Sequence, residues 1–139
     1  MLVLDTNVYI DAMEDPALGE RLATAVEASE DPVGVSSVVV AELLIGLKDP
    51  ARKSELLRHV VGESDAVLTP VDADWRIAGH ALRSLGGNAA TRRRSFWNDV
   101  LIAASCRRAG ATLLTSNRGD FKRIRGVIPV ETLAAWDHA

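Results

Sequence analysis

The sequence predicts an α/β protein in which helices pack on a parallel β-sheet. Short apolar runs alternate along the chain with longer segments whose apolar residues recur at helical spacing, which is the order of a sheet with crossover helices. Most runs are continuously apolar, as is typical of strands buried on both faces. With 139 residues, 47% of them hydrophobic, the chain is expected to form a single domain over residues 1–139.

The element boundaries follow from local breakers. Asp15-Pro16, Asp49-Pro50, Pro70 and Gly86-Gly87 each interrupt a periodic segment, and Pro129 favours the edge of the sheet for the last strand. The predicted strands, of which four to five form the sheet, are residues 2–4, 32–37, 66–69, 111–115 and 127–130. The predicted helices are residues 8–13, 18–30, 38–46, 51–61, 72–85 and 96–108, with a terminal turn or helix at 131–136.

The first strand ends on a carboxylate, Asp5, followed by Thr6 and Asn7. Thr6 or Asn7 can cap the first helix, which places Asp5 at the carboxyl end of a strand, where ligands bind in open α/β sheets. The alternative is that Asp5 itself is the helix cap and has no chemical role.

Two further acids lie in strongly apolar predicted helices. Glu42 is surrounded by Val, Ala, Leu and Ile, in a helix that Ser36 or Ser37 can cap, and it needs an ion pair, a solvent-facing edge or a cation. Asp99 falls in the first turn of the helix over 96–108, where the helix dipole alone could account for it. A fourth acid, Asp120, follows the strand over 111–115 in a polar turn, and capping of a short helix that begins at Phe121 is its alternative role.

The net charge of −3 hides a separation along the chain. Residues 1–75 contain 15 acidic and 5 basic residues, a net charge of −10, whereas residues 76–125 contain 11 basic and 2 acidic residues, a net charge of +9. Such halves are often only solvated surfaces. The two acids inside the basic segment are Asp99 and Asp120, which suggests that they have a specific role.

The cysteine content and the apolar runs bear on the cell compartment. Cys106 is the only cysteine, which excludes a disulfide framework and favours a reducing compartment. No cationic leader precedes the first apolar run and no run has the length of a membrane span. We therefore expect a cytoplasmic protein with no membrane partner.

Right-handed crossovers would bring the four acids, Asp5, Glu42, Asp99 and Asp120, to one edge of the sheet. Crowded carboxylates repel one another unless they share protons or bind a cation. Oxygen ligands without His or Cys favour Mg²⁺ or Mn²⁺, and the three histidines are scattered without ligand spacing. The sequence therefore predicts a divalent metal site.

The acidic segments resemble, in order and spacing, the motifs of PIN-domain proteins, specifically the VapC toxins of bacterial toxin–antitoxin pairs. The segments that carry the resemblance are LDTN at 4–7, AE at 41–42, NDVLIAA at 98–104 and LTSNRGDF at 114–121. The resemblance implies a three-layer α/β/α sandwich, a Mg²⁺- or Mn²⁺-dependent endoribonuclease, a homodimer and a cognate antitoxin. It also implies RNA products with 5′-phosphate and 3′-hydroxyl ends.

The resemblance assigns the acidic triad to Asp5, Glu42 and Asp99. Family members place the fourth ligand at the position of either Asn117 or Asp120. We take Asp120 as the ligand, with Thr115 and Asn117 as orienting residues. Thr6 and Asn7 are the other supporting residues of the predicted site.

An acidic centre would repel RNA unless cations flank it. The predicted RNA-binding residues are Arg92, Arg93, Arg94, Arg118, Lys122 and Arg123. The apolar residues of 43–47 and 56–61 exceed what one side of a small sheet can bury, and they could form a groove for an amphipathic antitoxin helix, or all be core. Such an inhibitor could direct a cation at the acids.

Two other functions compete with this prediction. A phosphoacceptor receiver domain is disfavoured because Thr69-Pro70 follows the third strand, and Thr115 to Asn117 follow the fourth, where that chemistry needs an acceptor Asp and a Lys. A catalytically silent PIN-like domain that binds only RNA or a protein partner is the alternative function.

Overall fold

A central parallel sheet organises the fold. The computed structural model describes residues 1–46, 48–86 and 93–135. Its five strands are parallel and lie in the order β3-β2-β1-β4-β5, which confirms the predicted sheet. The strands are β1 (Leu2–Leu4), β2 (Val33–Ser36), β3 (Ala66–Leu68), β4 (Thr112–Thr115) and β5 (Glu131–Ala134).

The strand order reverses beside β1. From β1 the chain adds β2 and β3 on one side, and then crosses to add β4 and β5 on the other. Leu2 of β1 is therefore paired with both Val33 of β2 and Thr112 of β4. In open α/β sheets the crevice outside the carboxyl ends of the strands at such a reversal is where ligands bind. Here the strand order reverses between β1 and β4, so the expected ligand site is at the carboxyl ends of these two strands.

Seven helices are seen in the part of the chain that the structure describes. They are α1 (Thr6–Glu14), α2 (Pro16–Ala28), α3 (Ser37–Gly46), α4 (Pro50–Gly62), α5 (Asp72–Ser84), α7 (Arg94–Ala109) and α8 (Arg118–Arg125). The breakers act as expected: Asp15 and Asp49 cap α2 and α4, each before a proline at the first helical position. Gly110, with φ of 65°, ends α7 in the left-handed conformation that glycine adopts without strain.

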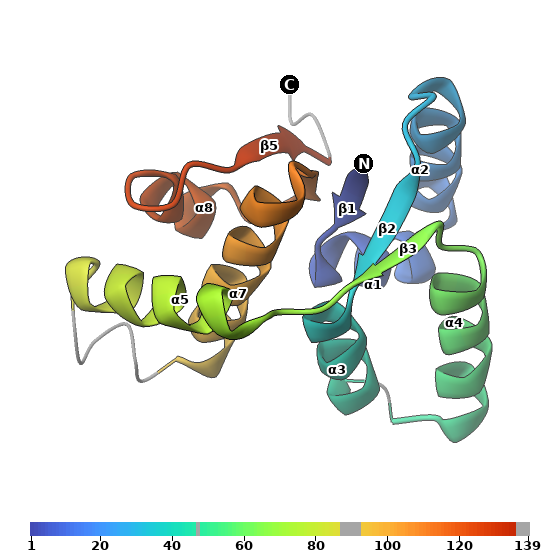
Figure 1. Ribbon diagram of the computed structural model, residues 1–139. Helices are drawn as coiled ribbons and strands as arrows, with labels where there is room; N and C mark the ends of the chain where they lie inside the picture. The colour runs from blue at the N-terminus through green and yellow to red at the C-terminus, as the bar shows by residue number, and fades with distance from the viewer. Residues whose placement is uncertain (47, 87–92, 136–139) are drawn as a thin grey trace.

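Two hydrophobic cores confirm the three layers. Val3 faces the larger core, which it shares with residues of α3, α5, α7 and α8, whereas Leu2 and Leu4 face a smaller one with Val8 and residues of α2. This division follows from the alternation of side chains along a strand. Figure 1 shows α5, α7 and α8 on one side of the sheet and α2 on the other.

An ion pair between the exposed Arg108 and the buried Asp74 fixes α5 to α7. Arg108 Nε donates to both carboxylate oxygens of Asp74, at 3.2 and 3.0 Å, and Arg108 Nη2 donates to the Thr69 carbonyl at 3.0 Å. Asp74 is fully buried and also accepts a hydrogen bond from the Val71 N–H. Because α7 carries Asp99, this ion pair helps to hold one acid in position.

The C-terminal part departs from the prediction. Residues 127–130 are not a strand; the backbone N–H groups of Val127 and Ile128 bond to the Ile124 carbonyl and close α8. The strand follows at Glu131–Ala134, where a turn or helix was expected, and pairs with β4. Core packing of Ile128 and Val130 thus explains the apolar run without a strand.

Within residues 1–46, 48–86 and 93–135, no helix is long and apolar enough to cross a membrane.

Candidate active site

Asp5 lies where the strand order of the sheet reverses, and it both caps α1 and bonds to the end of β4. Its Oδ1 accepts the Thr6 N–H at 2.9 Å, so Asp5 is the N-cap of α1; the prediction that Thr6 or Asn7 caps this helix is wrong. Its Oδ2 accepts the Thr115 hydroxyl at 2.8 Å from the end of β4. Only 2% of Asp5 is exposed, whereas Asn7 is exposed. Capping alone therefore does not account for the carboxylate, which is also tied to the neighbouring strand.

Thr6 links Asp5 to Glu42. The Thr6 hydroxyl donates to Glu42 Oε1 at 2.8 Å, while its backbone N–H donates to Asp5. Glu42 lies on α3 and is partly buried. An ion pair was one of the alternatives for Glu42, but the partner that the structure shows is a neutral hydroxyl.

Asn117 links the other two acids. Its Nδ2 donates to Asp99 Oδ2 at 3.2 Å and to Asp120 Oδ2 at 3.1 Å. Its Oδ1 accepts the Asp120 N–H at 3.4 Å, so Asn117 is the N-cap of α8, and its own backbone N–H donates to the Thr115 hydroxyl at 3.0 Å. A single chain of hydrogen bonds therefore runs from Glu42 to Asp120.

The helix positions of Asp99 and Asp120 differ from the predictions. α7 begins at Arg94, two residues earlier than predicted, so Asp99 lies in its second turn and the expected place in the first turn is wrong. α8 begins at Arg118, which places Asp120 inside its first turn rather than at a cap before Phe121. The helix dipole therefore does not explain Asp99, of which 6% is exposed.

Burial and mutual repulsion perturb the acids. Burial, followed by the charges of Asp5, Glu42 and Asp120, raises the pKa of Asp99 to about 8, although Arg93 lowers it. Burial also raises the pKa of Asp5, against hydrogen bonds from Thr115 and Thr6 that lower it. Such shifts mark a site where positive charge or protons must neutralise the carboxylates.

The donor set suits a hard divalent cation. The side-chain donors among the described residues bond to Glu42 Oε1, Asp99 Oδ2 and Asp120 Oδ2. No described side chain donates a hydrogen bond to the other oxygen of each carboxylate. Oxygen atoms of this kind are the ligands that Mg²⁺ and Mn²⁺ prefer. Across the described residues, however, no three acidic, His or Cys side chains form a ready-made metal site.

The predicted cations occupy three different settings. Arg93 Nη2 donates to Asp120 Oδ2 at 2.7 Å, and Arg94 lines a groove beside Glu42. Arg123 lies over the Phe96 ring at 5.1 Å and donates to the Leu85 carbonyl at 3.1 Å. Arg118 and Lys122 line a pocket between α8 and β5. Arg92 lies outside the described residues.

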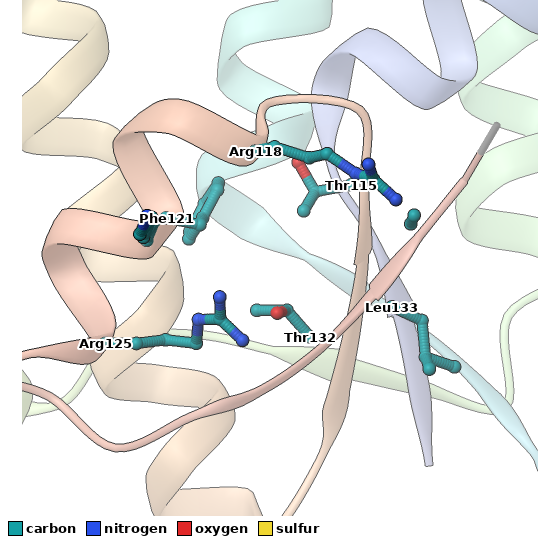
Figure 2. Close-up of a pocket in the computed structure, with 8 residues that line it drawn as sticks. Thr115, Arg118, Phe121, Arg125, Thr132 and Leu133 are labelled. Atoms are coloured by element: carbon teal, nitrogen blue, oxygen red, sulfur yellow. The ribbon is translucent and has the colours of Figure 1, made fainter. Parts of the chain in front are cut away.

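The same pocket contains residues that the sequence reasoning missed. Arg125 and Thr132 line it together with Arg118 and Lys122, as Figure 2 shows in part. The signal for Arg125 was available: Arg118, Lys122 and Arg125 are spaced four and three residues apart, which places them on one face of a helix. Thr132 gave no such signal because its segment was predicted as a turn or helix.

Known proteins show both the family and the fold. A model of the PIN domain matches residues 2–127. The chain is 27% identical over 143 residues to Ribonuclease VapC2 of Rickettsia felis, with 97% of each protein covered. It also matches DNA-bound VapBC from Salmonella typhimurium, with a TM-score of 0.75 and 19% identity over 97% of this chain and 98% of that chain. A toxin–antitoxin complex from Klebsiella pneumoniae matches with a TM-score of 0.70 and 17% identity over 99% of both chains. Since the family model covers most of its length, the chain belongs to the PIN domain family.

Proposed function

We propose that the protein is a Mg²⁺- or Mn²⁺-dependent endoribonuclease in which Asp5, Glu42, Asp99 and Asp120 hold the metal. The observation that carries this proposal is the convergence of four carboxylates from four elements at the reversal point of the sheet, where the pKa of Asp99 is raised to about 8. The Rickettsia felis relative is named a ribonuclease, which supports RNA as the substrate.

Hydrogen bonds from Thr6, Thr115 and Asn117 hold the four carboxylates in position. A bound divalent cation would supply Lewis-acid activation of a water molecule and of the phosphodiester. Thr6 and Thr115 each use a hydroxyl proton to hold one carboxylate oxygen, of Glu42 and Asp5 respectively, which leaves other oxygen lone pairs for the metal. Asn117 holds Asp99 and Asp120 in the same way. Without metal at neutral pH, Asp99 keeps a proton, which it would release on metal binding.

Arg93 and Arg94 flank the acids and are proposed to hold the RNA backbone. Arg93 is half-exposed and neutralises Asp120 in this structure. Its Nη2 donates to Asp120 Oδ2, so the other N–H groups of the guanidinium would remain available to a phosphate beside the acids.

Metal-free protein incubated with labelled single-stranded RNA tests the proposal. Cleavage is expected to appear and saturate as Mg²⁺ or Mn²⁺ is added, to stop in excess chelator, and to leave 5′-phosphate and 3′-hydroxyl ends. Cleavage that persists in excess chelator would contradict the metal assignment. RNA binding without cleavage under every metal condition would instead favour the catalytically silent RNA-binding domain.

A pair of variants tests the fourth ligand. Asp120→Ala is expected to weaken the apparent metal affinity and the rate more than Asn117→Ala, because Asp120 offers a charged oxygen and Asn117 only orients its neighbours, a role whose loss costs about 10- to 100-fold. Metal titrations of the cleavage rate measure both effects. Wild-type metal dependence in Asp120→Ala, together with its loss in Asn117→Ala, would reverse the two roles.

We further propose that the chain is the toxin of a cytoplasmic toxin–antitoxin pair and that it forms a homodimer. The Klebsiella pneumoniae structure of the same fold is a toxin–antitoxin complex, which supports a protein partner. Of the apolar residues expected to form a partner groove, Leu43 and Val60 are buried in the core, whereas Ile45 is 73% exposed and Leu44 and Val61 are also exposed. Leu47 lies outside the residues that the structure describes, and so does the side chain of Leu56.

Of these exposed residues, Ile45 lies in a groove beside Glu42. A groove of about 380 Å³ is lined by Ile45, Trp75, Leu101 and Glu42, among others. Trp75 of α5 is 52% exposed and adds a second large apolar side chain to this groove. An apolar surface that borders a catalytic acid is suited to a partner that also controls access to the site.

A further inference from the structure

The pocket between α8 and β5 has the composition of a phosphate-binding site. It has a volume of about 340 Å³ and is lined by Thr115, Arg118, Phe121, Lys122, Arg125, Thr132, Leu133 and Ala134. Phe121 is buried and belongs to the core, whereas the three cations are exposed. In Figure 2, Arg125 reaches across the gap from α8 toward Thr132 on β5, and Arg118 lies near Thr115 at the end of β4.

The positive charge of this pocket is not neutralised by nearby acids. Over the part of the chain that the structure describes, none of Arg118, Lys122 and Arg125 takes part in an ion pair. Asp120, the acid of α8, instead pairs with Arg93 and accepts from Asn117. Three cations at the rim of a pocket without a counter-charge favour the binding of an anion.

The pocket adjoins the acidic site through one shared side chain. Thr115 lines the pocket, and its hydroxyl donates to Asp5 Oδ2 at 2.8 Å. A strand of RNA whose phosphodiester lies at Asp5 would therefore place a neighbouring nucleotide over the end of β4, toward α8. The volume of the pocket, about 340 Å³, is at the lower end of the range for ligand pockets. A pocket of this size suits a single nucleotide unit rather than a folded protein partner.

We infer that Arg118, Lys122 and Arg125, with Thr132, form a subsite for the phosphate of a nucleotide next to the cleaved bond of the RNA. This inference rests on the proposed ribonuclease function and adds two residues, Arg125 and Thr132, to it. Arginine holds phosphate through paired N–H donors, and the Thr132 hydroxyl adds a neutral donor on the opposite wall. Arg123 has no part in the subsite because it is held by Phe96 and the Leu85 carbonyl.

Binding of a fluorescent single-stranded RNA to Arg125→Gln and Lys122→Gln tests the subsite. The affinity is measured at several salt concentrations in the Asp5→Asn background, which prevents cleavage. Each variant is expected to reduce the slope of log affinity against log salt by about 0.7, the value for one lost contact with a single-stranded phosphate. In the cleaving background, the KM should rise several-fold with kcat nearly unchanged, because binding energy common to ground and transition states is lost.

Two further variants distinguish phosphate binding inside the pocket from a general attraction of RNA to a basic surface. Arg107→Gln is the matched control: Arg107 is exposed in the last turn of α7, which leads into the amino end of β4, far from the subsite. It should leave the slope unchanged. Ala134→Leu alters no charge but fills the pocket beside Thr132, and it should lower the RNA affinity severalfold.

Other outcomes would overturn the inference, and each shows whether the proposed nuclease function fails with it. If the wild-type protein cleaves RNA with Mg²⁺ but Arg125→Gln, Lys122→Gln and Ala134→Leu retain its KM and salt slope, the subsite is wrong and the nuclease stands. If a poly-glutamate peptide binds the wild-type protein but not Arg125→Gln, and RNA affinity is the same in both, the pocket serves an acidic protein segment. If the wild-type protein neither binds nor cleaves RNA, both proposals fail together.

Discussion

An Asp5→Asn variant is expected to lose RNA cleavage in Mg²⁺ while keeping its fold. The amide oxygen can still accept the Thr6 N–H that begins α1, and the Thr115 hydroxyl can rotate to meet either amide atom. What is lost is a negative charge at the centre of the acidic site. Removal of a direct ligand should therefore cost more than the about 10- to 100-fold that loss of an orienting residue costs.

The measurement is the single-turnover cleavage rate at saturating Mg²⁺, with circular dichroism and a urea titration to confirm folding. Asp72→Asn is the matched control, because Asp72 is an exposed acid at the start of α5 whose ion-pair partner, among the described residues, is Arg76. The control should cleave at the wild-type rate. Undiminished cleavage by Asp5→Asn would remove Asp5 from the metal site.

An Asp99→Asn variant is expected to be more stable than the wild type when metal is absent and the pH is high. The pKa of Asp99 is about 8 in the folded protein, against an ordinary value of 3.8. Burial is the main cause of the raised pKa. An uncharged amide of the same shape therefore avoids most of the free-energy cost of burying an ionised carboxylate at this position. A difference of four pKa units corresponds to at most about 5 kcal/mol in the free energy of unfolding.

The sign of the pH dependence follows from the proton balance. Between pH 3.8 and about 8 the folded protein keeps a proton on Asp99 that the unfolded chain releases, so wild-type stability falls as the pH rises through this range. Below pH 3.8 Asp99 is protonated in both the folded and the unfolded protein, and above about pH 8 it is ionised in both. The contribution of Asp99 to the free energy of unfolding is therefore constant outside this range. The advantage of Asp99→Asn should therefore be small at low pH and largest above about pH 8.

Urea unfolding in chelator at about pH 5, 7 and 9 measures this difference. Excess Mg²⁺ should stabilise the wild type at pH 9 and have less effect on the variant, because the cation replaces the missing proton. Asp72→Asn again serves as the control and should change stability by less than about 1 kcal/mol at each pH. If the stability difference between Asp99→Asn and the wild type is the same at these pH values, the pKa of Asp99 is not raised in the folded protein.

The sequence predicted the sheet and its acids because both depend on patterns that short segments carry. Continuous apolar runs and their breakers placed β1 to β4 within about a residue or two, and their carboxyl ends brought Asp5 and Thr115 together. The last strand was misplaced because Val127 to Val130 are apolar for a different reason, the closure of α8 against the core.

The hydrogen bonds of the site could not be predicted in the same way. Whether Asp5 or Thr6 caps α1 is decided by the orientation of side chains that have nearly equal capping propensity. The contact of Thr6 with Glu42 depends on how α3 packs against α1, and the ion pair of Arg93 with Asp120 joins residues on two helices. These are tertiary contacts, which leave no periodic trace in the sequence.

The central position of β1 also has a consequence for when the site can form. The first strand along the chain pairs with β4, whose Thr115 lies 110 residues after Asp5. Contacts of such long sequence separation form late, since the loop between them must close first. During synthesis the segment that holds Asn117 and Asp120 emerges after nearly all of the fold. The acidic centre therefore forms only after the segment of Asn117 and Asp120 has emerged, and a nascent chain that stops before this segment lacks two of its members.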